Sequence, residues 1–179
     1  TLRIVPLIFS CSLLCFYAVV CKSSLEREIN TLDSSAGSEV YRRQVSNLPE
    51  LKGVGPRELK AIGVIGGGTM GAGIATAALL SGFSVVLIEM KDEAAKAAHD
   101  RISGNLQGAL KRGKIDQAKF DHLTGEALTV STEYDSLKDV DLVVEAVFED
   151  MDVKKQVFGK LDAVCKPGCV LASNTSYLA

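Results

Sequence analysis

The chain has 179 residues, of which 47% are hydrophobic and 6% aromatic, and it contains no tryptophan. This length suits one ordinary domain, or one domain with additional segments. Its formal net charge of −2 and its isoelectric point near 5.7 lack the basic excess that is typical of proteins that bind nucleic acids. We therefore expect no nucleic-acid partner.

The cysteines and histidines do not form a metal-binding pattern. Cys11, Cys15 and Cys21 lie in an apolar N-terminal stretch, and Cys165 and Cys169 lie near the other end of the sequence. No two of them form a C-x-x-C pair, and the sequence contains only two histidines. We therefore expect no metal site and no redox role for these thiols.

Residues 1–22 form an apolar segment of uncertain status. From Ile4 to Cys21 the sequence is apolar over 18 residues, which is short for a membrane span and long for the apolar centre of a signal peptide. Three interpretations remain open: a signal or membrane anchor, a buried helix of a preceding domain, or residues that are not part of the mature protein. Pro6 and the lack of a Lys/Arg cluster argue against an anchor.

Residues 23–58 are polar and are predicted to form a linker. The stretches "DSSAGSE" and "KGVGPRE" are typical of turns and loops. One short helix is expected around residues 40–45. The folded domain is expected to span residues 59–179.

Within this domain, short apolar runs alternate with helical patterns. Buried strands are expected in "AIGVIG", "SVVLIE", "ALTVST", "VDLVVEAV" and "CVLASN". Helices are expected in "MGAGIATAALLSG", in the charged "KDEAAKAAHDRISGNLQGALKRGK" and in "DMDVKKQVFGKLDAVC". In the last of these, Val153, Val157, Leu161 and Val164 recur at helical spacing. Repeated strand–helix–strand order predicts an α/β fold with a parallel sheet.

The first strand leads into a glycine-rich turn. Gly66, Gly68 and Gly71 have G-x-G-x-x-G spacing between a predicted strand and a predicted helix. In a phosphate-binding turn, the first glycine allows the tight turn, the second lets a pyrophosphate approach the backbone, and the third allows close helix packing. The N–H groups of Thr69 and Met70, at the start of the helix, would present partial positive charge to the phosphates.

An acidic residue at the end of the second strand completes this dinucleotide fingerprint. Glu89 follows Gly66 by 23 residues, near the ~20 that the fingerprint requires. Its carboxylate would accept hydrogen bonds from the adenosine ribose and repel a 2′-phosphate, which favours NAD over NADP; Lys91 is the nearest cation in the sequence. In the alternative interpretation, Gly71 and Gly73 only allow close helix packing and Glu89 faces water. The features together predict an NAD site in a Rossmann-type, doubly wound parallel sheet.

The later motifs resemble those of one enzyme family. "IGVIGGGTMGAGIA" and "DLVVEAVFEDMDVKKQVFGKLDAVCKPGCVLASNTSYLA" are similar to the NAD-binding domain of the L-3-hydroxyacyl-CoA dehydrogenases. "EAVFEDMDVKKQVF" and "CKPG" most resemble the multifunctional branch, in which an enoyl-CoA hydratase precedes the dehydrogenase on one chain. The resemblance covers about residues 59–179. It implies NAD-dependent oxidation of (S)-3-hydroxyacyl-CoA to 3-oxoacyl-CoA in fatty-acid β-oxidation.

The resemblance also implies roles for individual residues. It places Glu149 and Lys154 at the nicotinamide side of the cofactor, and Ser176 between the nicotinamide and the substrate's 3-hydroxyl. It places three residues of the charged helical hairpin near CoA: Asn105, Lys111 and Arg112. In the alternative interpretation, Glu149 is a helix-start acid, Lys154 an ordinary surface lysine and Ser176 a strand cap, and the hairpin cations form a solvated helix end.

Some parts of the family's enzymes have no counterpart in this sequence. In the family, a histidine oriented by an acid takes the hydroxyl proton and lies on an "HFFNP"-like stretch beyond the serine motif. The sequence ends at Ala179, and neither His99 nor His122 matches that position. A helical C-terminal domain, which completes the substrate cleft and usually the dimer interface, is also expected beyond it. We therefore expect a truncated enzyme that binds NAD and is inactive alone.

Other functions remain open. The main alternative is a non-catalytic Rossmann module that binds NAD as a sensor or structural ligand. A hydroxy-acid dehydrogenase acting on a small acid is disfavoured by "SNTS" and "EAVFED". For the complete enzyme we expect an acyl-CoA substrate and a homo-oligomer or multifunctional complex. The expected compartment is the cytoplasm, with the peroxisome, the mitochondrion or membrane anchoring through residues 4–21 as alternatives.

Overall fold

The structure is a computed structural model that describes residues 58–148 and 150–174. The predictions for the apolar segment 1–22 and for nearly all of the linker 23–58 lie outside the described residues. The same is true of Glu149 and Ser176. Within the described ranges, no helix is both long and apolar enough to span a bilayer.

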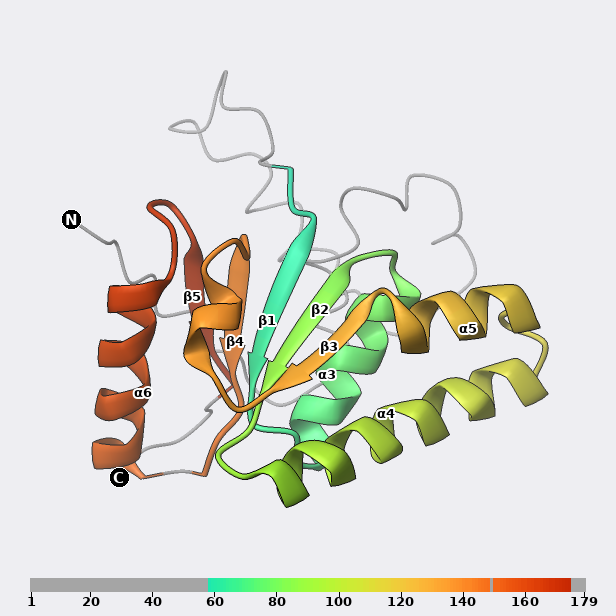
Figure 1. Cartoon of the computed structure of the whole chain (residues 1–179), viewed down its shortest axis with the longest axis horizontal. Helices are drawn as coiled ribbons and strands as arrows, with labels where there is room; N and C mark the ends of the chain where they lie inside the picture. The colour runs from blue at the N-terminus through green and yellow to red at the C-terminus, as the bar shows by residue number, and fades with distance from the viewer. Residues whose placement is uncertain (1–57, 149, 175–179) are drawn as a thin grey trace, which may run out of the picture. The chain divides into compact units, whose positions relative to one another are not determined.

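Five parallel strands form a single sheet with helices between them, as Figure 1 shows. The strands are β1 (Ala61–Ile65), β2 (Ser84–Ile88), β3 (Leu128–Ser131), β4 (Leu142–Glu145) and β5 (Val170–Ser173). The helices are α3 (Thr69–Leu80), α4 (Asp92–Lys111), α5 (Gln117–Gly125), the 3-10 helix η3 (Tyr134–Leu137) and α6 (Met151–Val164). The predicted α/β fold with a parallel sheet is therefore confirmed.

The strand order creates a switch point beside β1. The order is β3-β2-β1-β4-β5, so the chain first builds outward through β2 and β3 and then returns to the other side of β1. Ile62 accordingly pairs with Val85 on one side and with Leu142 on the other. In open parallel sheets, ligands bind at the carboxyl ends of the strands where the order reverses. In this sheet the order reverses between β1 and β4, so a ligand is expected at the carboxyl ends of these two strands.

Helices cover both faces of the sheet. The helices α3, α4 and α5 lie on one face, and η3 and α6 lie on the other (Figure 1). Under η3 and α6, a core cluster joins both elements to the strands: Ile65, Ile88, Leu137, Val140, Val143, Val157, Leu161, Cys169 and Leu171. Because both faces are covered, the strands are almost continuously apolar, as parallel strands usually are.

The helix ends follow local chemistry. Asp116 caps α5 by accepting a hydrogen bond from the Lys119 N–H, and Asp150 caps α6 through the Asp152 and Val153 N–H groups. The helix α3 has no side-chain cap and no acidic residue in its first turn. Side-chain acceptors normally satisfy the free N–H groups at such positions. The start of α3 is therefore open to an external acceptor.

The predicted apolar face of α6 is wrong at its first position. Val153 is 36% exposed, whereas Lys154 is 5% exposed. The buried positions of this helix are Lys154, Val157 and Leu161. The helical spacing of the apolar residues predicted the helix correctly. Its first buried position, however, is occupied by Lys154, which forms an ion pair, and not by Val153.

Candidate functional site

The glycine turn lies at the switch point of the sheet. Gly66 has φ +93°, a conformation that residues with a Cβ rarely adopt. A Cβ added there would lie 2.8 Å from the carbonyl oxygen of Ala146, which follows β4. The Gly66 N–H donates to the carbonyl oxygen of Ile88 at 2.9 Å. Gly66 therefore lets the ends of β1, β2 and β4 meet closely.

Gly71 and Gly68 differ in what surrounds them. A Cβ on Gly71 would overlap the carbonyl oxygen of Gly66, so α3 packs directly onto the turn. Among the described residues, no atom lies within 4 Å of a Cβ added to Gly68. The same is true of Gly73, so close packing does not require that glycine. Within the described residues, the Cβ position of Gly68 is thus open at the start of α3, where a ligand could approach the backbone.

The start of α3 has the chemistry of an anion site. Thr69 and Met70 are its first two residues and both are exposed. The N–H groups of a helix's first turn have no partner within the helix and carry partial positive charge. With no side-chain cap at this end, these donors fit the pyrophosphate of a dinucleotide.

Glu89 lies directly against the glycine turn. It follows β2, and its Oε1 accepts a hydrogen bond from the Gly67 N–H at 2.5 Å. Its Oε2 accepts one from the Met90 N–H at 3.2 Å. Glu89 therefore does not simply face water. Because each carboxylate oxygen accepts more than one hydrogen bond, Glu89 retains capacity for the hydroxyl groups of a ribose.

The roles of Gly67, in the turn, and of Arg101, on α4, were not predicted from the sequence. A Cβ on Gly67 would overlap the Cβ of Ala98 on α4. Arg101, also on α4, donates a hydrogen bond from its guanidinium to the Gly67 carbonyl oxygen. The Gly67 peptide is thus held by Glu89 on its N–H side and by Arg101 on its carbonyl side. The structure therefore adds Arg101 as a cation that contacts the glycine turn.

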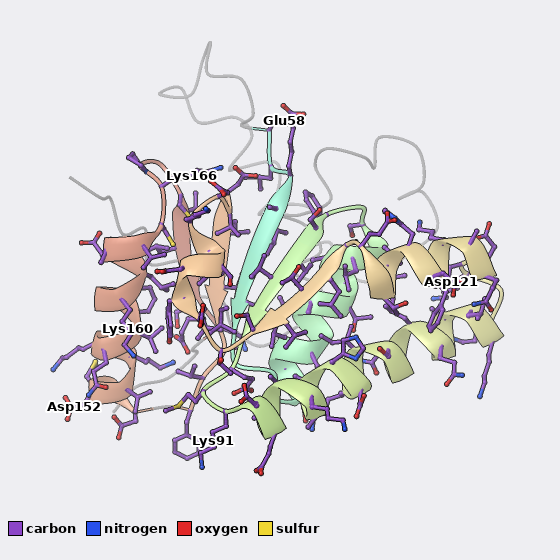
Figure 2. All side chains as sticks on the ribbon, in the orientation of Figure 1. Glu58, Lys91, Asp121, Asp152, Lys160 and Lys166 are labelled. Carbon is purple, nitrogen blue, oxygen red and sulfur yellow. The ribbon has the colours of Figure 1, made fainter. Side chains whose placement is uncertain are left out.

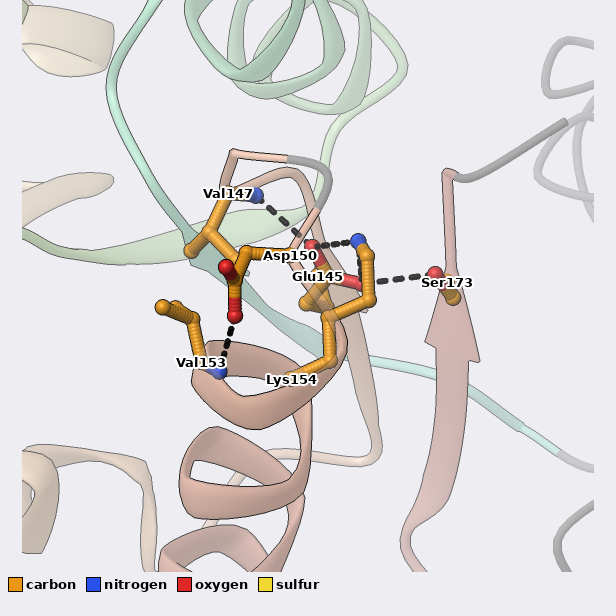
Figure 3. Close-up of polar contacts among 6 residues, drawn as sticks. All are labelled: Glu145, Val147, Asp150, Val153, Lys154 and Ser173. Atoms are coloured by element: carbon orange, nitrogen blue, oxygen red, sulfur yellow. Dashed lines mark hydrogen bonds and ion pairs between the residues drawn. The ribbon is translucent and has the colours of Figure 1, made fainter. Parts of the chain in front are cut away.

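A buried polar network lies at the ends of β4 and β5. Lys154 donates to both carboxylate oxygens of Glu145 at 2.8 Å, and the Ser173 hydroxyl donates to Oε2 of Glu145 at 2.6 Å (Figure 3). The Val147 N–H donates to Oε1 at 2.8 Å. The side chain of Glu145 is fully buried and that of Lys154 is 6% exposed. Describing Lys154 as an ordinary surface lysine is therefore wrong.

The residues predicted to contact CoA lie on α4 or at its end. Asn105 is exposed and donates to Oγ1 of Thr76 on α3 at 3.2 Å. Lys111 is the last residue of α4 and Arg112 follows it, both exposed. A helix of this length extends about 30 Å, so Arg112 lies far along α4 from the glycine turn.

Both histidines lie on the charged helices and pair with acidic neighbours. His99 on α4 lies 3.8 Å from Asp100, and His122 on α5 lies 2.7 Å from Glu126. Their side chains are 45% and 58% exposed. In the part of the chain that the structure describes, no group of three His, Cys, Asp or Glu side chains is close enough to hold a metal ion.

Comparison with known families identifies this domain. The family described as "3-hydroxyacyl-CoA dehydrogenase, NAD binding domain" matches residues 61–179, the range that contains the glycine turn and the buried network. The chain belongs to this family. NAD is therefore the cofactor of the domain, in agreement with the acidic residue and the open glycine turn.

Relatives of the NAD-binding domain include multifunctional enzymes. A glyoxysomal fatty acid beta-oxidation multifunctional protein from Brassica napus is 40% identical over 154 residues, which are 83% of this chain and 21% of that protein. The peroxisomal multifunctional protein MFP2 of Arabidopsis thaliana is 43% identical over 125 residues, 70% of this chain and 17% of the relative. The chain thus spans about a fifth of the length of these relatives.

A solved structure shows the same domain in a smaller dehydrogenase. The crystal structure of 3-hydroxybutyryl-CoA dehydrogenase from Escherichia coli matches with a TM-score of 0.64 and 36% identity, covering 69% of this chain and 26% of that one. The NAD-binding domain therefore occurs both in multifunctional relatives and in 3-hydroxybutyryl-CoA dehydrogenases. The predicted Rossmann-type fold is confirmed by this likeness.

Proposed function

We propose that this chain provides the NAD-binding domain of an enzyme that oxidises (S)-3-hydroxyacyl-CoA to 3-oxoacyl-CoA in fatty-acid β-oxidation. The observation that supports it best is the uncapped start of α3 beside Gly68, at the switch point of a domain in the dehydrogenase family. NAD, when bound, supplies the hydride acceptor. The relatives' names support the acyl-CoA substrate and the β-oxidation context.

The chain's own residues would hold and orient the cofactor. Gly66, Gly68 and Gly71 shape the turn, and the N–H groups of Thr69 and Met70 would bind the pyrophosphate. Glu89, already fixed by the Gly67 N–H, would bind the ribose hydroxyls. Glu149 and Lys154 would contact the nicotinamide side. Of these two, Lys154 is held in place by its buried ion pair.

The substrate side of the proposal concerns residues near the sheet edge and along α4. Ser176 would hydrogen-bond the 3-hydroxyl of the substrate and so orient the alcohol that becomes a ketone. In the sequence Ser176 comes three residues after Ser173, the last residue of β5, and β5 itself ends at the same carboxyl edge as the glycine turn. Asn105 and Arg112 would contact CoA along α4, because a CoA molecule is long enough to extend away from the reaction centre.

The proposal extends to the setting of the enzyme. Multifunctional relatives support a longer protein that combines this domain with further activities. The names glyoxysomal and peroxisomal support the peroxisome, one of the alternatives to the cytoplasm that the sequence left open. Fluorescence microscopy of the complete protein beside a peroxisomal marker tests the compartment.

Cofactor titration tests the binding site. We expect the chain to bind NAD⁺ and NADH and to bind NADP⁺ at least tenfold more weakly, because Glu89 would repel a 2′-phosphate; a tenfold difference corresponds to about 1.4 kcal/mol. Isothermal titration calorimetry measures both affinities. Equal affinity for NAD⁺ and NADP⁺ would remove Glu89 from this role.

A matched pair of glycine variants tests the turn in the same experiment. Gly68→Val should abolish NAD binding without unfolding the domain, because the added side chain fills space that is open in the structure. Gly104→Val is the control, since Gly104 on α4 also has no atom within 4 Å of an added Cβ. NAD binding that survives Gly68→Val would show that the cofactor lies elsewhere.

A further inference from the structure

The ion pair of Glu145 and Lys154 is almost completely removed from water. The Glu145 side chain is 0% exposed and the Lys154 side chain 6%. Burying one charge alone is costly, and a partner at hydrogen-bond distance offsets that cost. Here one carboxylate faces one ammonium, with both oxygens contacting the same nitrogen at 2.8 Å. The pair is therefore neutral as a unit.

The other hydrogen bonds of this network are made to Glu145 and not to Lys154. Ser173 at the end of β5 and the Val147 N–H after β4 both donate to the carboxylate. Lys154 has three N–H donors, and its hydrogen bonds within the described residues use two of them. Glu145 is thus anchored from two strand ends, and it positions an ammonium group that has one donor to spare.

The network lies at the edge of the sheet where the cofactor is proposed to bind. Glu145 ends β4, and β4 lies beside β1, which leads into the glycine turn. Gly66 and Ala146, the residues that follow these two strands, approach each other closely. Lys154 enters this edge from the first turn of α6, as Figure 3 shows.

We infer that Glu145 is a positioning residue that neutralises Lys154 and thereby sets the balance between binding of NAD⁺ and NADH. The inference rests on the proposed contact of Lys154 with the nicotinamide side. The nicotinamide ring of NAD⁺ carries a positive charge, and that of NADH does not. An ammonium without its carboxylate would repel the oxidised ring and leave the reduced ring unaffected, most strongly where water is excluded.

The test is the ratio of two dissociation constants, Kd for NAD⁺ divided by Kd for NADH, measured by calorimetry on the whole chain. Glu145→Gln should raise this ratio about tenfold, because it leaves the Lys154 ammonium without its carboxylate. The glutamine is nearly the same size and still accepts hydrogen bonds through its amide oxygen. A purely structural role would weaken both cofactors equally and leave the ratio unchanged.

Two further variants separate charge from geometry. Ser173→Ala removes one hydrogen bond to the same carboxylate without changing any charge, so the ratio should stay within about twofold of the original. Glu145→Gln combined with Lys154→Gln restores a neutral pair, and the ratio should return toward that of the original chain. This double variant also keeps the test valid if Glu145→Gln alone is unstable, because it contains no unpaired buried ammonium.

The outcomes distinguish this inference from the proposed function. An original chain that binds neither NAD⁺ nor NADH would contradict the proposed function itself. If the original chain binds both and Glu145→Gln leaves their ratio unchanged, only the role of Glu145 is overturned. The role of Glu145 is also overturned if the double variant Glu145→Gln with Lys154→Gln keeps the raised Kd ratio of Glu145→Gln. The unpaired Lys154 ammonium would then not be the cause of the raised ratio.

Discussion

The glycines of the turn are alike in the sequence motif but differ in what they do. Gly66 has a positive φ and a close carbonyl neighbour, and Gly71 touches the backbone of Gly66. These two glycines are required for the fold. Gly68 has open space around it and is required only if a ligand fills that space. The spacing of the motif is visible in the sequence, but this division of roles depends on tertiary contacts.

Gly71→Ala should destabilise the domain by about 1–3 kcal/mol, the usual range for overpacking a close contact. The added methyl group would overlap the Gly66 carbonyl and push α3 away from the turn. Gly73→Ala, two residues further along α3, is the control, because its Cβ meets nothing within 4 Å and alanine favours a helix. Urea unfolding measures the free energy of unfolding of both variants. Equal stability of the two would show that α3 does not depend on close contact at Gly71.

Glu89 could be predicted from the sequence and Glu145 could not. Glu89 has a local signal, because its distance from Gly66 is part of a known pattern. Glu145 ends an apolar strand without any such pattern. Its partners, Lys154 and Ser173, are 9 and 28 residues away. For the same reason the contact of Arg101 with Gly67, over 34 residues, had no signal in the sequence.

At the level of elements, the hydrophobic pattern predicted the long helices and the strands well. The strands were predicted from short apolar runs and the helices from longer stretches between them, and all of these are present. The 3-10 helix η3 was not predicted, because four residues are too few for a period. The strand predicted over 140–147 is shorter, Leu142–Glu145, because the Val147 N–H turns to the Glu145 carboxylate instead of continuing the ladder.

The strand starts are joined by a polar contact at the edge opposite the glycine turn. Asp141, just before β4, accepts hydrogen bonds from the N–H groups of Lys60 and Ala61, and its carboxylate pairs with Lys166 at 2.6 Å. Figure 2 shows Lys166 at this edge and Lys91 at the other. Burial raises the pKa of Asp141, but the bonds from Lys166 and from the two backbone N–H groups outweigh it and lower the pKa to about 2.

This contact predicts a defined loss of stability in acid. Because the folded-state pKa of Asp141 lies below its ordinary value of 3.8, its contribution is fully present above about pH 4 and is lost as the pH falls toward 2. Asp141→Asn should therefore lower the free energy of unfolding by about 1 kcal/mol at neutral pH, since solvent screens the partly exposed Lys166. Thermal unfolding as a function of pH measures this difference.

The difference in the free energy of unfolding between the original chain and Asp141→Asn should shrink as the pH falls from about 4 to 2. Asp121→Asn is the control: Asp121 is exposed on α5 and accepts a hydrogen bond from the Gln117 amide. Figure 2 shows it far from the sheet edge. A constant difference down to pH 2 would mean that Asp141 stabilises the domain through packing and not through its charge.

For the domain as a whole, the topology gathers the residues proposed to bind NAD at one edge of the sheet. The reversal of strand order beside β1 brings the glycine turn, Glu89 and Glu145 to the carboxyl edge of the sheet, whereas Asp141 joins the strands at the amino edge. Residues far apart in the sequence therefore meet at one edge. The glycine motif predicted an NAD site at the turn after the first strand, whereas the order of the strands is visible only in the structure.

The last prediction concerns activity. Removing the proton of a secondary alcohol during hydride transfer requires a base, and general acid–base catalysis contributes about 10²–10⁴-fold to the rate. The two histidines of this chain lie on α4 and α5, His99 beside Asp100 and His122 beside Glu126, the residue that follows α5. We therefore expect the 179-residue chain to bind NAD⁺ but to form no measurable NADH from (S)-3-hydroxybutyryl-CoA.

Absorbance at the NADH band measures this directly, with a complete 3-hydroxybutyryl-CoA dehydrogenase as the positive control. If the chain alone turns over, replacing His99 and His122 by glutamine, singly, identifies whether either supplies the base. If turnover survives both replacements, the next candidate among the described residues is the Glu145–Lys154 pair, which is buried at the carboxyl edge of the sheet.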